Sequence, residues 1–180
     1  MEGRTVTDAR SHTANEVLKD GTAVTIRAIR RGDAQSVLQA FSKFDRDSIY
    51  QRFFQLKKEL TSAELIQITE VDFSQVFALV ATTQTRDGEI LIGGGRFVSD
   101  PDESWESADL AFITDDAYQG RGVASLILKH LVKIARERRI VRFKADVLAD
   151  NRSMMRVFQR SGLPMLQKRG RNVIHVTLTL

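Results

Sequence analysis

The alternation of apolar and polar positions divides the first half of this 180-residue chain into a hairpin and a helical block. The apolar runs 17–18 and 23–29 flank Asp20-Gly21, a pair that favours a tight turn because glycine tolerates positive φ. Residues 1–14 are polar and show no periodicity, so we expect a flexible tail there and a single folded domain over 15–180.

Helical periodicity predicts three helices between residues 33 and 70. Asp33 is the expected cap of the first helix, which runs to about residue 44, and the second covers about 48–57. The third begins at a capping box, in which Thr61 and Glu64 can satisfy each other's backbone donors.

From residue 76 onward the pattern predicts strands that alternate with two helices. The strands are expected at 76–83, 89–98, 108–114, 141–148 and on both sides of a turn at Gly170. The run Gly93-Gly94-Gly95 indicates a bulge or a close backbone contact. The two helices are expected at 122–137, with an apolar stripe, and at 151–161. This order predicts an α/β or α+β domain with a mixed sheet.

Composition narrows the class of protein. Hydrophobic residues make up 42% of the chain, and no apolar run approaches the roughly 18 residues that a membrane span needs. The first residues lack the apolar stretch of a secretory signal, and the absence of cysteine excludes disulfides and thiolate metal sites. The three histidines, His12, His130 and His175, are scattered. We therefore expect a cytoplasmic protein with no membrane span and no metal site.

The net charge of +4 suits either nucleic acid or an anionic nucleotide cofactor. No basic motif with interleaved aromatic residues accompanies the charge, so we do not expect nucleic-acid binding to be the main function.

A glycine-bearing turn joins the strand at 109–114 to the long helix, with the sequence Gln119-Gly120-Arg121-Gly122-Val123-Ala124. The two glycines let the backbone approach a bulky anion, and the first turn of the helix offers unpaired N–H groups and a partial positive charge. This arrangement favours a phosphate cradle. On the glycine pair alone, a strand-to-helix turn without a ligand is an equal alternative.

The spacing Gln119-x-x-Gly122-x-Ala124 resembles the cofactor motif of the GNAT family of N-acetyltransferases. A second signature of that family, an asparagine at the start of a helix that follows a strand, is matched by Asn151. The resemblance covers about residues 17–180. It implies a mixed, mostly antiparallel sheet of six to seven strands flanked by helices and splayed between its fourth and fifth strands, here 108–114 and 141–148. It also implies acetyl-CoA as co-substrate.

The resemblance assigns roles to particular residues. The backbone of Phe112, Ile113 and Thr114 would hold the pantetheine arm, and the side chain of Gln119 would order the turn. Asn151 would hydrogen-bond the cofactor or anchor the opened strand, and the alternative is that it only caps its helix. Five amides would bind the pyrophosphate, those of Gly120, Arg121, Gly122, Val123 and Ala124.

Amine acetylation also needs a base, because a lysine with a pKa of about 10.4 is almost wholly protonated at neutral pH. Asp109 is the candidate, as a charged residue in an otherwise apolar strand. It stands where protein-lysine acetyltransferases of this family have a longer glutamate, so a bridging water is expected. The alternative is a strand-end aspartate paired with an arginine. Phe158 occupies the place of the tyrosine acid in many members, so no side-chain acid is expected.

A finer likeness, to the bacterial protein-lysine acetyltransferase (Pat) domains, lies in Ser48–Phe54, Glu70-Val71-Asp72, Arg96–Asp100 and 117–122. It implies a protein lysine as acceptor, possibly on an acyl-CoA synthetase. The helical block at 33–70 would then either flank the acceptor groove or only pack over the sheet. Two rival functions stay open, a small-molecule amine N-acetyltransferase with a closed acidic pocket and a non-catalytic acyl-CoA sensor.

Overall fold

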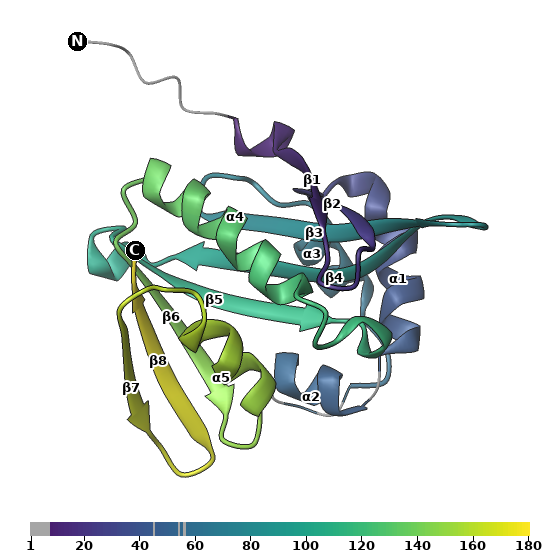
Figure 1. Ribbon diagram of the computed structural model, residues 1–180. Coiled ribbons are helices and arrows are strands. Elements are labelled where there is room, and N and C mark those ends of the chain that lie inside the picture. The colour runs from purple at the N-terminus through teal and green to yellow at the C-terminus, as the bar shows by residue number, and fades with distance from the viewer. Residues whose placement is uncertain (1–7, 45, 54, 56) are drawn as a thin grey trace.

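One eight-stranded sheet organises the chain, in the order β1-β2-β3-β4-β5-β6-β8-β7 (Figure 1). The computed structural model describes residues 8–44, 46–53, 55 and 57–180. The strands are β1 Thr13–Val17, β2 Ala23–Ala28, β3 Val76–Thr85, β4 Gly88–Ser99, β5 Ser107–Thr114, β6 Arg142–Leu148, β7 Met165–Arg169 and β8 Val173–Thr179. All neighbours are antiparallel except β5 and β6, which are parallel.

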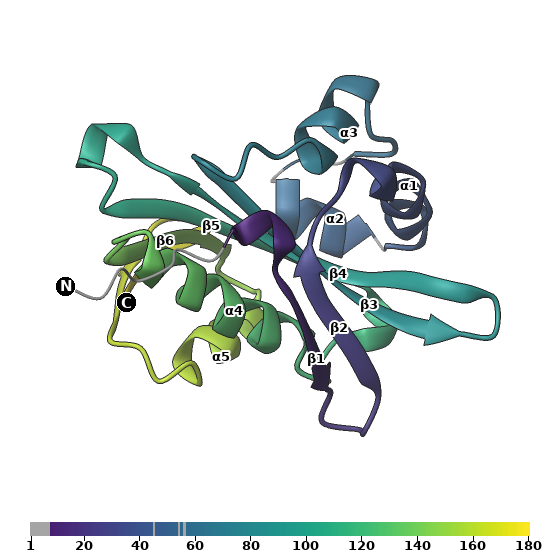
Figure 2. The same cartoon turned by 90° about the horizontal axis from the view of Figure 1, so that it is seen from above.

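The helices form a layer on each face of this sheet. Figure 2 shows α1, α2 and α3 on one side of the sheet and α4 and α5 on the other. Their bounds are α1 Ala34–Lys43, α2 Arg46–Phe53, α3 Ser62–Thr69, α4 Val123–Glu137 and α5 Arg152–Gln159. None of the described helices is long and apolar enough to cross a membrane. The predicted mixed fold with a helix layer on either side is confirmed.

Some predicted boundaries are wrong. The sheet has eight strands instead of six to seven, because β1 pairs with β2 and begins at Thr13. Ala9 is buried in the core, so residues 9–14 do not belong to a tail, and residues 1–7 lie outside the described part of the chain. The second helix runs over Arg46–Phe53 instead of 48–57.

Asp33 does not cap α1 through its side chain. Its two carboxylate oxygens each accept a hydrogen bond of 2.8 Å from the guanidinium of Arg27, and one of them also accepts from the Arg30 amide at 2.7 Å. Arg27 reaches Glu89 on β4 as well, at 3.0 Å. A buried, bidentate ion pair therefore takes the carboxylate away from the helix end, because charge-assisted bonds are stronger than a cap. The capping box of Thr61 and Glu64 is confirmed at α3.

The glycine run in β4 lets α4 lie close against the sheet. The register between β3 and β4 shifts at Ala81, which leaves Ile92 as an extra residue in a bulge. A Cβ on Gly93 would lie 2.8 Å from Val123 of α4, and one on Gly95 would lie 2.6 Å from Ile127. Both predicted features, a bulge and a close backbone contact, are present, and side chains of α4 pack directly against the glycine backbone of β4.

The parallel pair opens after a short contact. Pairing of β5 with β6 joins Ser107 to Arg142, Ala108 to Phe143 and Asp109 to Lys144, and the two strands are not paired beyond that point. The predicted splay between these strands is confirmed, and it lies between the two helix layers.

We predict that Gly95→Ala destabilises the fold by about 1–3 kcal/mol relative to Gly94→Ala, because overpacking a core has this typical cost. The Cβ at position 95 would meet both Ile127 and the Phe112 ring within 2.9 Å, whereas the nearest atom at position 94 is 3.5 Å away. The gain from restricting the unfolded chain is common to both variants. Urea unfolding of the two proteins measures the difference, and equal midpoints would contradict the close helix–sheet contact.

Candidate active site

A cleft of about 600 Å³ follows the splay of β5 from β6. One end lies at the turn before α4, the middle runs along Phe112, Ile113 and Thr114 of β5, and the other end reaches Asp109. The cleft therefore joins the glycine-bearing turn to the candidate base, two features that the sequence analysis derived separately.

The turn before α4 places helix N–H groups at the first end of the cleft. Gly120 and Gly122 have φ values of +75° and +104°, a region that favours glycine. The first hydrogen bond of α4 runs from the Leu126 amide to the Gly122 carbonyl at 3.0 Å, so the amides of Val123 and Ala124 precede the helical pattern. Such amides point outward with the positive end of the helix dipole and suit an anion.

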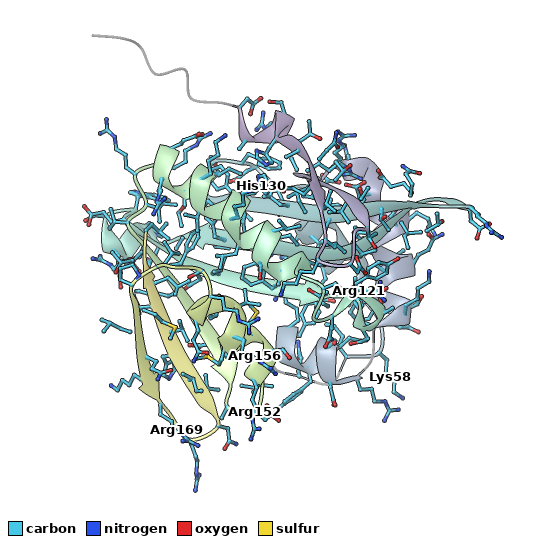
Figure 3. The ribbon with its side chains drawn as sticks, in the orientation of Figure 1. Lys58, Arg121, His130, Arg152, Arg156 and Arg169 are labelled. Atoms are coloured by element: carbon cyan, nitrogen blue, oxygen red, sulfur yellow. The ribbon has the colours of Figure 1, made fainter. Side chains whose placement is uncertain are left out.

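Arg121 is placed differently from its neighbours. It is the one residue of 119–124 that does not line the cleft, and its amide donates to the Tyr118 carbonyl at 3.4 Å. Its guanidinium pairs with Asp20 at 2.9 Å and lies 5.0 Å from the centre of the Tyr118 ring. Figure 3 shows this side chain at the turn before α4. Arg121 therefore fastens the turn to the β1–β2 hairpin, and the structure does not bring its amide to the cleft as expected.

Gln119 ties the turn to α2. Its side-chain amide donates to Ser48 Oγ at 3.0 Å and to Asp116 Oδ1 at 2.5 Å, and Ser48 Oγ donates to the same carboxylate at 2.7 Å. Since Ser48 belongs to α2 and Asp116 to the segment after β5, these bonds order the turn across two distant parts of the chain.

The middle of the cleft has an open strand edge and an apolar floor. Beyond Asp109 the backbone of β5 has no partner on the β6 side, so Phe112, Ile113 and Thr114 can pair with an extended ligand there. Phe158 is fully buried, and its ring centre lies 6.3 Å from that of Phe112. Asn151 Oδ1 accepts from the Met154 amide at 3.0 Å, which makes it the N-cap of α5, although the residue also lines the cleft.

Asp109 lies at the far end of the cleft with its carboxylate exposed. Burial by the cleft walls raises the pKa of this carboxyl, and the negative charges of Asp100, Asp146 and Glu103 add to the rise against the opposing charge of Lys144. Lys144 itself pairs with Glu103. Among the described residues no cation forms an ion pair with Asp109, so the structure does not support the alternative of a strand-end aspartate paired with an arginine.

The cleft has opposite charges at its two ends. Lys19 lies beside Gly122 at the turn before α4, and Arg156 and Arg160 also line the cleft, with Arg156 labelled on α5 in Figure 3. Asp109 and Asp146 line the other end, where Asp146 pairs with His175 at 2.6 Å. This polarity suits an anionic cofactor at one end and a cationic amine at the other.

Three residues of the site escaped the sequence analysis, namely Arg52, Lys144 and Asp146. Lys144 and Asp146 belong to β6 and reach Asp109 only through the parallel register. Arg52 belongs to α2, and only the packing of that helix beside β5 brings it to the cleft. The alternation of β6 was a usable signal, because three charged residues, Arg142, Lys144 and Asp146, stand on one face of the strand and apolar residues stand on the other.

A mixed sheet that opens after a short parallel pair, with a glycine-bearing helix N-terminus at the mouth of the opening, defines the GNAT class of acetyltransferase. The model of the acetyltransferase (GNAT) family matches residues 43–163. The chain belongs to this family of acetyltransferases, which use acetyl-CoA.

The relatives agree with this assignment. The chain is 31% identical over 147 residues to the acetyltransferase Pat of Mycolicibacterium smegmatis, and it spans only 42% of that relative's length. It is 30% identical to an acetyltransferase of Pseudomonas aeruginosa, over 77% of this chain and 74% of the relative. The GNAT domain of the S. lividans PAT has a TM-score of 0.84 and 33% identity, with 93% of this chain and 97% of that domain covered.

We predict that Gly122→Val abolishes acetyl-CoA binding, because a branched side chain at φ +104° forces the backbone of the phosphate cradle to change. Gly88→Val is the matched control, since Gly88 has a φ of +113° in the β3–β4 turn and does not line the cleft. Both variants lose stability from backbone strain. Calorimetric titration with acetyl-CoA should show binding only in Gly88→Val, and retained affinity in a folded Gly122→Val protein would remove the turn from the cofactor site.

Proposed function

We propose that this N-acetyltransferase transfers the acetyl group of acetyl-CoA to a lysine side chain of a protein, with Asp109 as general base. The observation that supports the role of Asp109 most directly is its unpaired carboxylate with a raised pKa, at the end of the cleft opposite the phosphate cradle. A raised pKa makes this carboxylate a stronger base, because its affinity for the proton is higher than in water.

The cofactor is proposed to lie along β5. Its pyrophosphate sits on the amides of Gly120, Gly122, Val123 and Ala124, without the amide of Arg121, and its pantetheine arm pairs with the open edge at 112–114. Gln119 keeps the turn ordered, and Asn151 acts as the cap of α5. The thioester then lies beside residues 110 and 111, next to Asp109.

The chemistry follows from this placement. Asp109 removes a proton from the lysine ammonium, directly or through a bridging water, since aspartate is a short side chain. The neutral nitrogen attacks the thioester carbon, the new C–N bond forms, and the C–S bond breaks to release coenzyme A as a thiolate. Phe158 is buried and has no ionisable group, so the thiolate takes its proton from water. Asp109 returns its proton to solvent.

The acceptor class rests on the likeness to Pat domains and on α2. Ser48 and Arg52, both in the Pat-like stretch 48–54, line the cleft, which favours a helical block that flanks the acceptor groove. The acyl-CoA synthetase acceptor and the cytoplasmic location remain predictions from the sequence. The acidic end of the cleft also suits a small amine, so that rival is tested below.

We predict that Asp109→Asn lowers turnover by about 10²–10⁴-fold at neutral pH, the usual scale of general base catalysis. The wild-type rate should fall as pH drops through the raised pKa of Asp109. The deficit of the variant should shrink as pH rises, because more acceptor amine is then already neutral. The pH–rate profile with saturating acceptor measures both effects. Glu106→Gln, which changes the nearest preceding carboxylate outside the cleft, should leave the rate unchanged.

The stability of Asp109→Asn separates catalysis from a structural role. A raised pKa means that the folded protein disfavours the ionised carboxylate, a cost that is absent below the unfolded pKa of about 3.9 and complete above the folded pKa. The variant should therefore be at least as stable as wild type at pH 7, with the difference vanishing in acid. A clear loss of stability at pH 7 would indicate a structural carboxylate instead.

We predict that labelled acetyl-CoA, incubated with the enzyme and a cell lysate, transfers its label to protein lysines. Asp109→Asn is the control for enzyme-dependent labelling, and mass spectrometry locates the modified residues. Rapid turnover of a polyamine or aminoglycoside with unlabelled proteins would establish the small-molecule rival. Binding of acetyl-CoA without any turnover would establish the sensor.

A further inference from the structure

Two arginines without an acid partner lie beside the cleft. Arg52 comes from α2 and Arg96 from β4, and both are partly buried. In the described part of the chain no carboxylate forms an ion pair with either guanidinium. Burial, followed by the charge of Arg96, lowers the pKa of Arg52 to about 10. Both side chains line the same small pocket, in which no described carboxylate balances their charges.

Such an arrangement needs an explanation. Removing an arginine from water is costly unless a partner compensates, which is why arginines in protein interiors are almost always paired. Arg27 illustrates the usual solution, since Asp33 binds it in bidentate fashion. Arg52 has an aromatic contact instead, with its guanidinium carbon 4.9 Å from the centre of the Phe53 ring. This contact fixes the direction of the guanidinium and leaves its N–H donors for an anion.

A small apolar pocket of about 90 Å³ lies at these two arginines. Its walls come from the sheet and from the α1–α3 layer and include Phe41, Phe53 and Leu60. Arg52, Ala111 and Ile113 line both this pocket and the large cleft, so the two spaces meet at β5. The pocket combines apolar walls with two guanidinium groups, a chemistry that suits a short hydrocarbon chain ending in a carboxylate.

The position of the pocket relates it to the acyl group. Alternate residues of a strand point to the same face, so Asp109, Ala111 and Ile113 share the face that α1 and α2 cover. In the proposed function the thioester lies beside residues 110 and 111. The acyl chain that leaves the thioester on this face enters the pocket at Ala111, and its far end points toward Arg96, whose register partner on β5 is Ala111.

We propose that Arg52 and Arg96 form a carboxylate-binding site beside the thioester, which takes the free carboxylate of a short dicarboxylic acyl group such as succinyl. This inference rests on the proposed cofactor placement. The transfer step is unchanged: the amine nitrogen bonds to the thioester carbon, the C–S bond breaks, and the distal carboxylate is not consumed. A carboxylate could also reach this site from the acceptor protein, on an acidic residue next to the acceptor lysine. The experiment below separates the acyl group from the acceptor as the source of the carboxylate.

The first arm compares two stable thioethers of coenzyme A, carboxypropyl-CoA and butyl-CoA, which differ by the carboxylate alone. Charge-assisted hydrogen bonds predict that wild type binds carboxypropyl-CoA about 10–100-fold more tightly in calorimetric titration. Arg52→Gln and Arg96→Gln should each reduce this preference at least severalfold. Arg52→Lys keeps the positive charge but loses the paired N–H donors of the guanidinium, so it should retain only part of the preference for carboxypropyl-CoA. Arg169→Gln, on the exposed strand β7, is the matched control and should keep it (Figure 3).

The second arm uses acetyl-CoA and two acceptor peptides, in which glutamate or glutamine adjoins the lysine. If wild type has a lower KM for the glutamate peptide than for the glutamine peptide, and Arg52→Gln abolishes this difference, the carboxylate site is supported with the acceptor as its source. No carboxylate preference in either arm, with coenzyme A affinity intact, would overturn the inference while the proposed function stands. Failure of wild type to bind both thioethers would overturn the cofactor placement, and the inference with it.

Discussion

The pairing of β5 with β6 stops after Asp109 and Lys144, and the site depends on this break. A continuous parallel pair would bury the backbone edge of β5 and leave no space between the helix layers. Because the strands diverge, β5 keeps an unpaired edge along Phe112, Ile113 and Thr114, and a cleft extends from the start of α4 to Asp109. The last paired residue of β5, Asp109, therefore lines the cleft at the point where the strands diverge.

Close packing of α4 determines where the proposed phosphate cradle lies. Gly93 and Gly95 carry no Cβ, so Val123 and Ile127 contact the backbone of β4 directly. This contact places the N-terminus of α4 at the mouth of the splay, where Gly122 starts the helix at a positive φ. The bulge at Ile92 and the glycine run thus act together, since each contributes to the position of the N-terminus of α4.

The charged residues of the cleft are not evenly distributed. Basic residues of the β1–β2 hairpin and of α5 line the cleft, while acidic residues surround Asp109. The nearest lysine, Lys144, is paired with Glu103, so the partly buried carboxylate of Asp109 has mainly negative charges around it. That surrounding is a physical cause of its raised affinity for a proton. On the same face of β5 as Asp109, a small apolar pocket meets the cleft and is lined by Arg52 and Arg96, with which no carboxylate among the described residues pairs.

The sequence by itself determined the features that depend on neighbours along the chain. The glycine-bearing turn at Gln119–Ala124, the long apolar stripe of α4, and the capping box of Thr61 and Glu64 all follow from local spacing, and the structure contains them. Only the tertiary structure decided features that join distant segments. Asp33 was predicted to cap a helix, but Arg27 of the neighbouring strand binds it more strongly. Lys144 reaches Asp109 through a strand register, and Arg52 reaches the cleft through the packing of α2. Local patterns specify turns, caps and amphipathic faces, whereas the pairing of charges across a fold depends on which segments meet, which no local pattern records.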